Sequence, residues 1–317
     1  MNIVFLDAES VPNSDLTLIQ QKGSLTCYKT TEANENLGEI LKTADIIISN
    51  KVKLDAQSLS AAPRLKLICV AATGYNNIDI AAAAKYGITV CNVSGYSTDS
   101  VAQHFFAVLL NWNIQLQQYQ LASQNGQWLN SHLFCCLDYP IVELKNKTLT
   151  LIGYGNIAQA IEKLALAFGM HVIIAERQNK SPCRANRVAF DQAIAQADIV
   201  SLHCPLTPET ANMVDARFIE KLKPQAILIN TARGGLINEN ALSLALKNKQ
   251  IQAALLDGLS QEPPTLDNPL LIPQPNLMIT PHTAWASQEA RQTLVNEIAL
   301  NIEAFKQGKK RNQITSL

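Results

Sequence analysis

The chain has 317 residues, a length that favours two domains, each able to bury its own core. Its 26 basic and 26 acidic residues balance, which excludes a general electrostatic reason to bind nucleic acid or an anionic membrane and favours a small-molecule ligand. The seven cysteines are scattered without metal-ligand spacing, and no apolar run approaches the roughly 18 residues of a membrane span. We therefore expect a cytoplasmic protein with no metal site, no membrane segment and no nucleic-acid partner.

Short apolar runs alternate with helix-forming segments over roughly the first 95 residues. Five runs predict strands, namely NIVFLD, SLTCYK, DIIISN, LKLICVAA and ITVCNV, and two segments between them predict helices, NLGEILKTA (36–44) and NIDIAAAAKYG (77–87). Alternation of this kind is typical of a parallel sheet that helices cover on both faces. The sequence therefore predicts a doubly wound α/β domain in this region.

Two turns of this domain carry candidate ligand-binding residues. Thr73, Gly74 and Tyr75 follow the fourth expected strand at a helix start, where open α/β sheets bind ligands and backbone amides attract carboxylates. A glycine in such a turn often has only a conformational role. Lys51 follows the third strand at the same edge, either as a ligand-binding residue or as a solvated surface lysine.

The segment from Ser97 to about Leu121 has a polar start, an apolar middle and no Gly or Pro, so it predicts one long helix that connects the two domains. Residues 125–144 contain apolar side chains without a clear period, among them Trp128 and Phe134. An apolar loop of this kind either covers a partner subunit or packs as a flap on its own domain.

Residues 148–176 have the order strand, glycine-rich turn, amphipathic helix and strand. Gly153 and Gly155 permit a tight turn and the close approach of a pyrophosphate to the amides of Asn156 and Ile157 at the helix start. Glu176, at the end of the second strand, is placed to accept hydrogen bonds from an adenosine ribose. We predict a dinucleotide site here; the alternative is a glycine-rich turn without a ligand.

The type of dinucleotide depends on two adjacent residues. Glu176 favours NAD, because its charge would oppose a 2′-phosphate, whereas Arg177 could reach such a phosphate, so NADP stays an alternative. Further strand and helix alternation then continues a doubly wound sheet through ADIVSLHCPLT, AILINTARGG, IQAALLDGL and NLMITPH. Residues near the ends of these strands point into one crevice and complete the expected cofactor set: Cys204, Pro205, Thr210, Thr231, Ala232 and Asp257.

Residues 257–286 contain Glu262 and His282, each next to a proline. A Glu within reach of a His holds the imidazole in one tautomer and favours its protonated form, which a proton donor requires. The two residues are either an acid/base pair or unrelated side chains of a Pro-rich loop. Their place after the last strands of a dinucleotide-binding sheet, downstream of Arg233, favours catalysis.

Seven segments in order, ATGYNNID, GYSTDSVAQH, GYGNIAQA, HCPLTPET, NTARGGLINE, LDGLSQEPP and TPHTAWAS, together resemble the D-isomer-specific 2-hydroxyacid dehydrogenase family. The residues in these segments are most similar to the glycerate dehydrogenase, or hydroxypyruvate reductase, branch of that family. The resemblance runs from about residue 45 to residue 291. The sequence departs from the family's pattern at Ala158, where glycine is usual, and at Gly258, where a β-branched residue commonly follows the Asp.

The resemblance implies two α/β domains with the active site in the cleft between them. The first is a flavodoxin-like substrate domain of residues 1–98 and 287–317, and the second is a Rossmann-type NAD domain of residues 99–286. Arg233 would bind the substrate carboxylate, His282 would transfer the proton, and Glu262 would support the His. The implied substrate-binding set is Lys51, Thr73, Gly74, Tyr75, Arg233, His282 and Trp285.

The implied reaction is the NAD-dependent reduction of a small 2-oxo acid, best hydroxypyruvate or glyoxylate, to D-glycerate or glycolate, and its reverse. One alternative is another 2-oxo acid. The other is a non-catalytic, NAD-sensing protein similar to a corepressor, because such family members keep the same catalytic residues. Residues 125–144 match the part of relatives that packs against a second subunit, so the resemblance also implies a homodimer.

Overall fold

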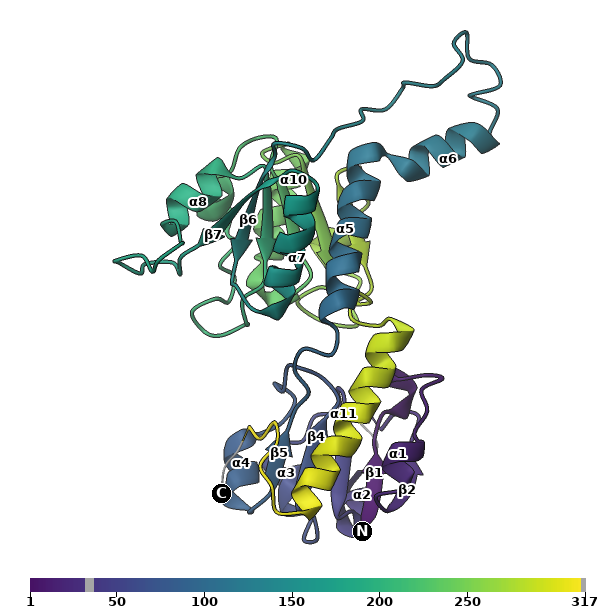
Figure 1. Cartoon of the computed structure of the whole chain (residues 1–317), viewed down its shortest axis with the longest axis vertical. Coiled ribbons are helices and arrows are strands. Elements are labelled where there is room, and N and C mark those ends of the chain that lie inside the picture. The colour runs from purple at the N-terminus through teal and green to yellow at the C-terminus, as the bar shows by residue number, and fades with distance from the viewer. Residues whose placement is uncertain (32–36, 315–317) are drawn as a thin grey trace. The chain divides into compact units, whose positions relative to one another are not determined.

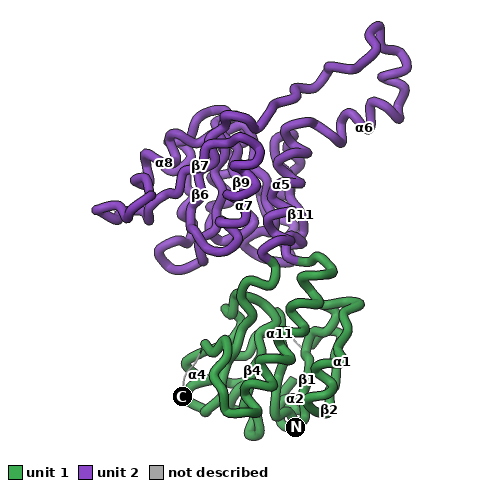
Figure 2. Tube along the Cα trace, viewed as in Figure 1, with its two compact units in different colours: residues 1–97, 286–317 green, residues 98–285 purple. Residues whose placement is uncertain are grey.

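The computed structural model describes residues 1–31 and 37–314, and the chain forms two compact units (Figure 2). Unit 1 comprises Met1–Ser97 and Ala286–Leu317, and unit 2 comprises Thr98–Trp285. Both expected domain boundaries lie one residue C-terminal to the observed ones. Asn36, the first residue of one expected helix, lies outside the described residues.

Unit 1 is built on a parallel sheet with the strand order β2-β1-β3-β4-β5. The strands are β1 Asn2–Phe5, β2 Ser24–Cys27, β3 Ile46–Ser49, β4 Leu67–Val70 and β5 Thr89–Cys91. Every residue of β3 and β4 is buried, because helices cover both faces of the centre of the sheet. All five expected strands are present, and their order is that of flavodoxin-like folds, which confirms the expected class.

The C-terminal helix completes unit 1. This helix, α11 Gln288–Lys306, begins at Ser287, whose side chain accepts a hydrogen bond from the Ala290 amide. It buries Leu294, Ile298 and other apolar residues, and it contacts β4 and the short helix α1 (Figure 1). The remaining helices of the unit are η1 Ala8–Ser10, α1 Thr17–Gln20, α2 Leu37–Thr43, α3 Ala56–Ser60 and α4 Ile80–Lys85.

Unit 2 is built on a second parallel sheet, with the order β11-β10-β9-β8-β6-β7. Its strands are β6 Thr148–Ile152, β7 His171–Ala175, β8 Ile199–Leu202, β9 Ile227–Asn230, β10 Ala253–Asp257 and β11 Leu277–Thr280. Val188 pairs with Ala175 in a single parallel bridge beside β7. With this bridge counted as a reduced third strand, the order is the Rossmann order extended by one strand at the far edge.

Helices cover both faces of this sheet. Successive residues of a strand point to opposite faces, so neighbouring residues of one strand pack against different helices. Leu228 of β9 packs in one core with residues of α8 and α10, whereas the next residue, Ile229, packs in the other core with Phe105 of α5 and Ile161 of α7. The helices of the unit are α5 Thr98–Ile114, α6 Leu116–Gln124, α7 Asn156–Ala167, α8 Phe190–Gln196, α9 Ala216–Glu220, η2 Gly234–Leu236, α10 Glu239–Lys247 and η3 Pro269–Leu271.

The prediction of one long helix over residues 97–121 is wrong. Gln115 has a left-handed φ of 53°, and this residue separates α5 from α6. Its side-chain amide donates to the Trp112 carbonyl oxygen at 2.7 Å, which satisfies an acceptor at the end of α5. The chain therefore turns, and α6 and the loop after it extend away from the sheet of unit 2 (Figure 1). Within residues 1–31 and 37–314, no helix combines the length and apolar composition needed to cross a bilayer.

Candidate active site

A buried asparagine shapes the turn that carries Arg233. Asn230, the last residue of β9, accepts a hydrogen bond from the Ala232 amide at 3.0 Å and donates one to the Arg233 carbonyl oxygen at 2.8 Å. One nitrogen of the Arg233 guanidinium donates to the Ala232 carbonyl oxygen at 2.7 Å. These hydrogen bonds hold the turn in place, and within residues 1–31 and 37–314 the other guanidinium donors make no hydrogen bond. The sequence alone did not indicate this role of Asn230.

The turn after β9 packs directly on the turn after β10. A β-carbon on Gly234 would lie 2.0 Å from the carbonyl carbon of Leu259, so only glycine permits this approach. Glu239, in the first turn of α10, holds the second turn: it accepts hydrogen bonds from the amide and hydroxyl of Ser260 at 2.7 Å and from Asn268 at 2.9 Å. The segments of Arg233 and Glu262 are therefore neighbours at the carboxyl edge of the sheet.

Glu262 and His282 form a hydrogen-bonded pair. Glu262 Oε2 lies 2.6 Å from His282 Nδ1, and Glu262 Oε1 accepts the Leu259 amide at 3.1 Å. Because a carboxylate only accepts, Nδ1 carries the hydrogen and Nε2 is left to face a ligand. Both side chains are partly exposed. The geometry is that of a general acid/base imidazole oriented by a carboxylate.

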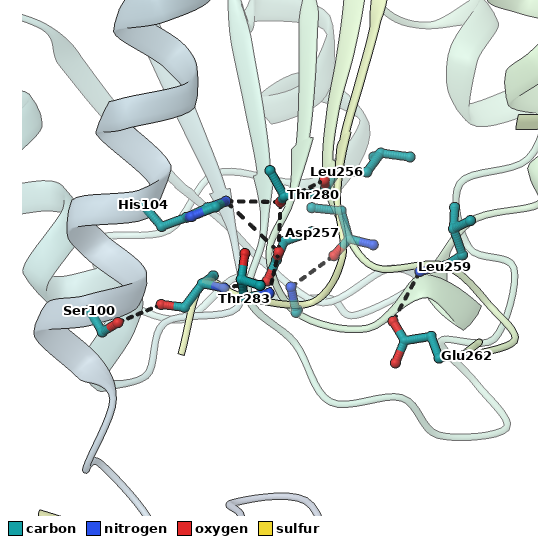
Figure 3. A network of polar contacts seen from close by, with 11 residues as sticks. Ser100, His104, Leu256, Asp257, Leu259, Glu262, Thr280 and Thr283 are labelled. Carbon is teal, nitrogen blue, oxygen red and sulfur yellow. Dashed lines mark hydrogen bonds and ion pairs between the residues drawn. The ribbon is translucent and has the colours of Figure 1, made fainter. Parts of the chain in front are cut away.

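Asp257 fixes the loop that carries His282 (Figure 3). The buried carboxylate accepts the Thr280 hydroxyl at 2.6 Å, the Thr283 amide at 2.8 Å and the Ala284 amide at 2.9 Å. His282 has a φ of 54°, which is rare for a side chain of this size, and these contacts on both sides hold it there. Asp257 therefore positions His282, and the expected contact of Asp257 with the cofactor stays a prediction.

Two residues of α5 support the same loop, and the sequence did not single them out. His104 Nε2 lies 3.1 Å from the Thr280 hydroxyl and 3.9 Å from Asp257, and Ser100 Oγ donates to the Ala284 carbonyl oxygen at 2.6 Å (Figure 3). Their spacing of four residues puts both on one face of α5. The spacing of these two polar residues along α5 was the available signal.

The glycine turn of unit 2 fits a dinucleotide. Gly153 has a φ of 92°, and a β-carbon there would lie 2.5 Å from the carbonyl oxygen of His203. Gly155 begins α7 without a side-chain cap, and a β-carbon on it would meet nothing within 4 Å. Thr231 Oγ1 is buried without a hydrogen-bond partner among the described residues. An open, uncapped helix start suits a pyrophosphate, which the amides of Asn156 and Ile157 would hold.

The segment after β8 carries the other predicted cofactor residues, Cys204, Pro205 and Thr210. The Thr210 hydroxyl donates to the Pro205 carbonyl oxygen at 2.7 Å and accepts the Thr207 amide at 2.8 Å, so it shapes this turn. Burial raises the pKa of the Cys204 thiol, which keeps it protonated and unreactive. Ala232 follows β9 in the Arg233 turn. Contacts of these residues with a cofactor stay predictions.

His203, which precedes Cys204, belongs to the fold of this turn. Its Nε2 lies 2.7 Å from the Ser201 hydroxyl. Burial lowers the pKa of the imidazole from 6.5 to about 4, so the ring is neutral near pH 7.

The Glu176 side chain is not oriented as the sequence suggested. It is fully buried, and its carboxylate accepts from the Arg184 guanidinium at 2.5 to 3.1 Å and from the amides of Arg177 and Arg184 at 2.8 and 2.9 Å. Hydrogen bonds from Arg184 hold the pKa of Glu176 well below its usual range. Because these donors already occupy both oxygens, the expected contact with an adenosine ribose is not available in this structure.

Unit 1 holds its candidate residues on two fixed turns. The buried carboxylate of Asp7 accepts the amides of Asn50 and Lys51 at 2.9 and 2.7 Å, which shapes the turn after β3. After β4, the Thr73 hydroxyl donates to the Val93 carbonyl oxygen at 3.0 Å, and Tyr75 is exposed. Substrate contacts of Lys51, Gly74 and their neighbours, and of Trp285 in unit 2, stay predictions.

Comparison with known proteins identifies the family. Residues 106–284 match the model described as D-isomer specific 2-hydroxyacid dehydrogenase, NAD binding domain. The chain is 40% identical over 313 residues to the glycerate dehydrogenase of Methylorubrum extorquens, covering 98% of both chains. It is 36% identical over 317 residues to the hydroxypyruvate reductase of Blautia hydrogenotrophica, covering 97% of this chain and 98% of the relative.

A solved acyclic imino acid reductase, in complex with NADPH and D-Arg, is similar with a TM-score of 0.86 and 31% identity, covering 99% of this chain and 100% of that chain. The chain belongs to the D-isomer-specific 2-hydroxyacid dehydrogenase family. The predicted family, its glycerate dehydrogenase branch and the α/β fold with a Rossmann-type NAD domain are thereby confirmed.

Proposed function

We propose that this chain reduces hydroxypyruvate or glyoxylate to D-glycerate or glycolate with a nicotinamide cofactor, and catalyses the reverse. The observation that carries the proposal is the 2.6 Å contact of Glu262 with His282 on the loops that follow β10 and β11 of the dinucleotide-binding unit. The names of the two relatives, glycerate dehydrogenase and hydroxypyruvate reductase, support this choice of substrate.

Arg233 is the proposed carboxylate-binding residue. Its planar fork of donors can hold a carboxylate through two parallel hydrogen bonds, which fixes the orientation of the substrate as well as its position. The Asn230 contacts hold the turn in place, so little conformational entropy is lost when substrate binds. A lysine at this position would supply the charge without the fixed geometry.

His282 is the proposed proton donor. The bound reduced nicotinamide supplies the hydride, and the chain's own residues supply orientation and the proton. During reduction, protonated His282 Nε2 stabilises the negative charge that develops on the substrate oxygen and then donates its proton there. During oxidation the neutral imidazole accepts the hydroxyl proton. Glu262 holds Nδ1 throughout, so the reacting nitrogen does not rotate away.

We also propose that residues 114–142, which we call the arm, bind a second copy of this chain. Several large apolar side chains of the arm are exposed: Leu129 at 87%, Phe134 at 92% and Leu137 at 70%. Water-exposed apolar surface of this extent is typical of an interface. Light scattering should give the mass of a dimer, and Phe134→Asp should shift it towards monomer. A monomeric native chain would contradict the proposal.

A cytoplasmic location is proposed on the state of the cysteines. All seven are free thiols in the structure, which suits a reducing compartment.

One panel of substrates tests the proposed reaction. Oxidation of NADH and of NADPH is followed by absorbance with hydroxypyruvate, glyoxylate, pyruvate and phenylpyruvate. We expect kcat/KM for the first two to exceed that for the others by about tenfold or more, which is about 1.4 kcal/mol of transition-state discrimination. Preference for pyruvate or phenylpyruvate would establish another 2-oxo acid as the substrate. Cofactor binding without turnover of any of them would favour an NAD sensor.

A further inference from the structure

The loop of residues 177–187 lies at the place where the adenosine end of a dinucleotide is bound in Rossmann-type sheets, after the strand next to the glycine-turn strand. Its two ends are tied together. The Glu176 amide donates to the Val188 carbonyl oxygen at 2.8 Å, and the Val188 amide donates to the Ile174 carbonyl oxygen at 3.0 Å. The loop therefore has a defined position beside the end of β7.

A second contact joins this loop to the glycine turn. The Arg187 guanidinium lies 6.0 Å from the centre of the ring of Tyr154, the residue between Gly153 and Gly155, and it donates to the Ala175 carbonyl oxygen at 3.1 Å. The loop and the proposed pyrophosphate site are thus neighbours, and a ligand on the glycine turn would extend towards the loop.

The loop has a strong excess of positive charge. Residues 177–187 contain four basic residues, Arg177, Lys180, Arg184 and Arg187, and no acidic residue. Arg184 forms an ion pair with Glu176 and donates four hydrogen bonds to its carboxylate, three from the side chain and one from the backbone amide. In the part of the chain that the structure describes, the Arg177 side chain has no hydrogen-bond or ion-pair partner.

These contacts change the effect that Glu176 is expected to have on the choice between NAD and NADP. A free carboxylate at the end of this strand accepts hydrogen bonds from the ribose 2′-hydroxyl and repels a 2′-phosphate. A carboxylate that is buried under a guanidinium does neither, because its oxygens are occupied and its charge is neutralised locally. The group left exposed at this position is the adjacent Arg177, which suits an anion.

We propose that Arg184 is a positioning residue that withholds Glu176 from the ribose, and that Arg177 binds a 2′-phosphate, so that the site accepts NADP(H) at least as tightly as NAD(H). The inference rests on the proposed dinucleotide-dependent function. It concerns the adenosine end alone, so it makes no claim about the 2-oxo acid.

Calorimetric titration of the full chain with two adenosine fragments tests the proposal without any turnover. The probes are 5′-AMP and 2′,5′-ADP, which differ only in the 2′-phosphate. We expect 2′,5′-ADP to bind at least as tightly as 5′-AMP. Tighter binding of 5′-AMP would overturn the proposal and show that Glu176 turns to the ribose. Absence of binding by both fragments and by NADH would instead overturn the dinucleotide site itself.

Two single variants separate the roles of the arginines. Arg177→Gln should weaken 2′,5′-ADP by about tenfold, the value of one charge-assisted contact, and leave 5′-AMP within about twofold. Arg184→Gln frees the Glu176 carboxylate, so it should also weaken 2′,5′-ADP by about tenfold or more while 5′-AMP binds as before or more tightly. Unchanged 2′,5′-ADP binding in either variant would contradict the assigned role.

A double variant distinguishes positioning from a merely structural role of Arg184. In Glu176→Gln with Arg184→Gln no carboxylate remains to repel the phosphate, so 2′,5′-ADP binding should recover to within about threefold of the native chain. If Arg184 only kept the loop folded, the double variant would stay weak towards both fragments, and the proposal would fail. Lys247→Gln, at the C-terminal end of α10, removes the same charge elsewhere and should change neither affinity.

Discussion

Gly258 leaves open the space that the Glu262 carboxylate occupies. A β-carbon on Gly258 would lie 2.1 Å from Glu262 Oε1 and 3.6 Å from the His282 β-carbon, and Gly258 has a φ of 104°, which only glycine adopts without strain. Gly258, one of the residues at which the sequence departs from its family's pattern, therefore leaves room for the Glu262 carboxylate beside His282.

Gly258→Ala should displace Glu262 from His282. We expect kcat to fall by about tenfold or more, because the imidazole loses its orientation, and the free energy of unfolding to fall by about 1 to 3 kcal/mol from backbone strain. NADH affinity should stay within about twofold. Gly38→Ala, in α2, is the matched control, since a β-carbon there meets nothing within 4 Å, and it should leave kcat unchanged and should not lower the free energy of unfolding. A Gly258→Ala enzyme with native kcat would contradict this prediction and show that Glu262 still contacts His282 in the variant.

His282→Ala should remove the proton donor. Positioned acid/base groups contribute about 10² to 10⁴ in rate, so kcat should fall by that factor while NADH affinity, measured by fluorescence, changes by less than about twofold. His171→Ala, at an exposed histidine at the start of β7, serves as the control. Near-native turnover of His282→Ala would end the assignment.

Glu262→Gln should act only through His282. The carboxamide can donate to Nδ1 and so permit the wrong tautomer, and we expect kcat to fall by about tenfold to a hundredfold. In the His282→Ala background the same change should cost less than about twofold, because residues that act as a unit are not additive. Equal losses in the two backgrounds would mean that Glu262 contributes independently of His282.

His203 should make the protein less stable in acid. Its pKa is about 4 in the folded chain and 6.5 when exposed, so the unfolded chain binds the extra proton between these values. The folded state therefore loses up to about 3 kcal/mol as pH falls from about 6.5 to about 4; above about 6.5 His203 costs no stability, and below about 4 the loss does not grow. Urea unfolding at about pH 7 and about pH 4.5 measures this, with His203→Gln as a non-titrating control. An equal acid loss in the variant would assign the effect to other groups.

The sequence predicted the strands well, because runs such as DIIISN and LKLICVAA are apolar throughout and lie between helix-forming segments. It predicted Arg233, Glu262 and His282 as candidates through their motifs, and two of them form a hydrogen bond. The break at Gln115 could not be foreseen, since no glycine or proline marks it. The side-chain direction of Glu176 depends on Arg184 in an irregular loop, and the support of His282 by His104 links residues 178 positions apart; local patterns encode neither.

The discontinuity of unit 1 has a consequence for synthesis on the ribosome. Residues 1–97 emerge first, but the helix α11 that packs on β4 is made only after the whole of unit 2. At about 5 to 20 residues per second, translation of the intervening segment takes roughly 10 to 40 s. For that interval the nascent chain exposes the apolar face of β4 to water, whereas unit 2 is continuous and can fold before it. Synthesis of unit 1 therefore begins first, but unit 1 completes its fold after unit 2.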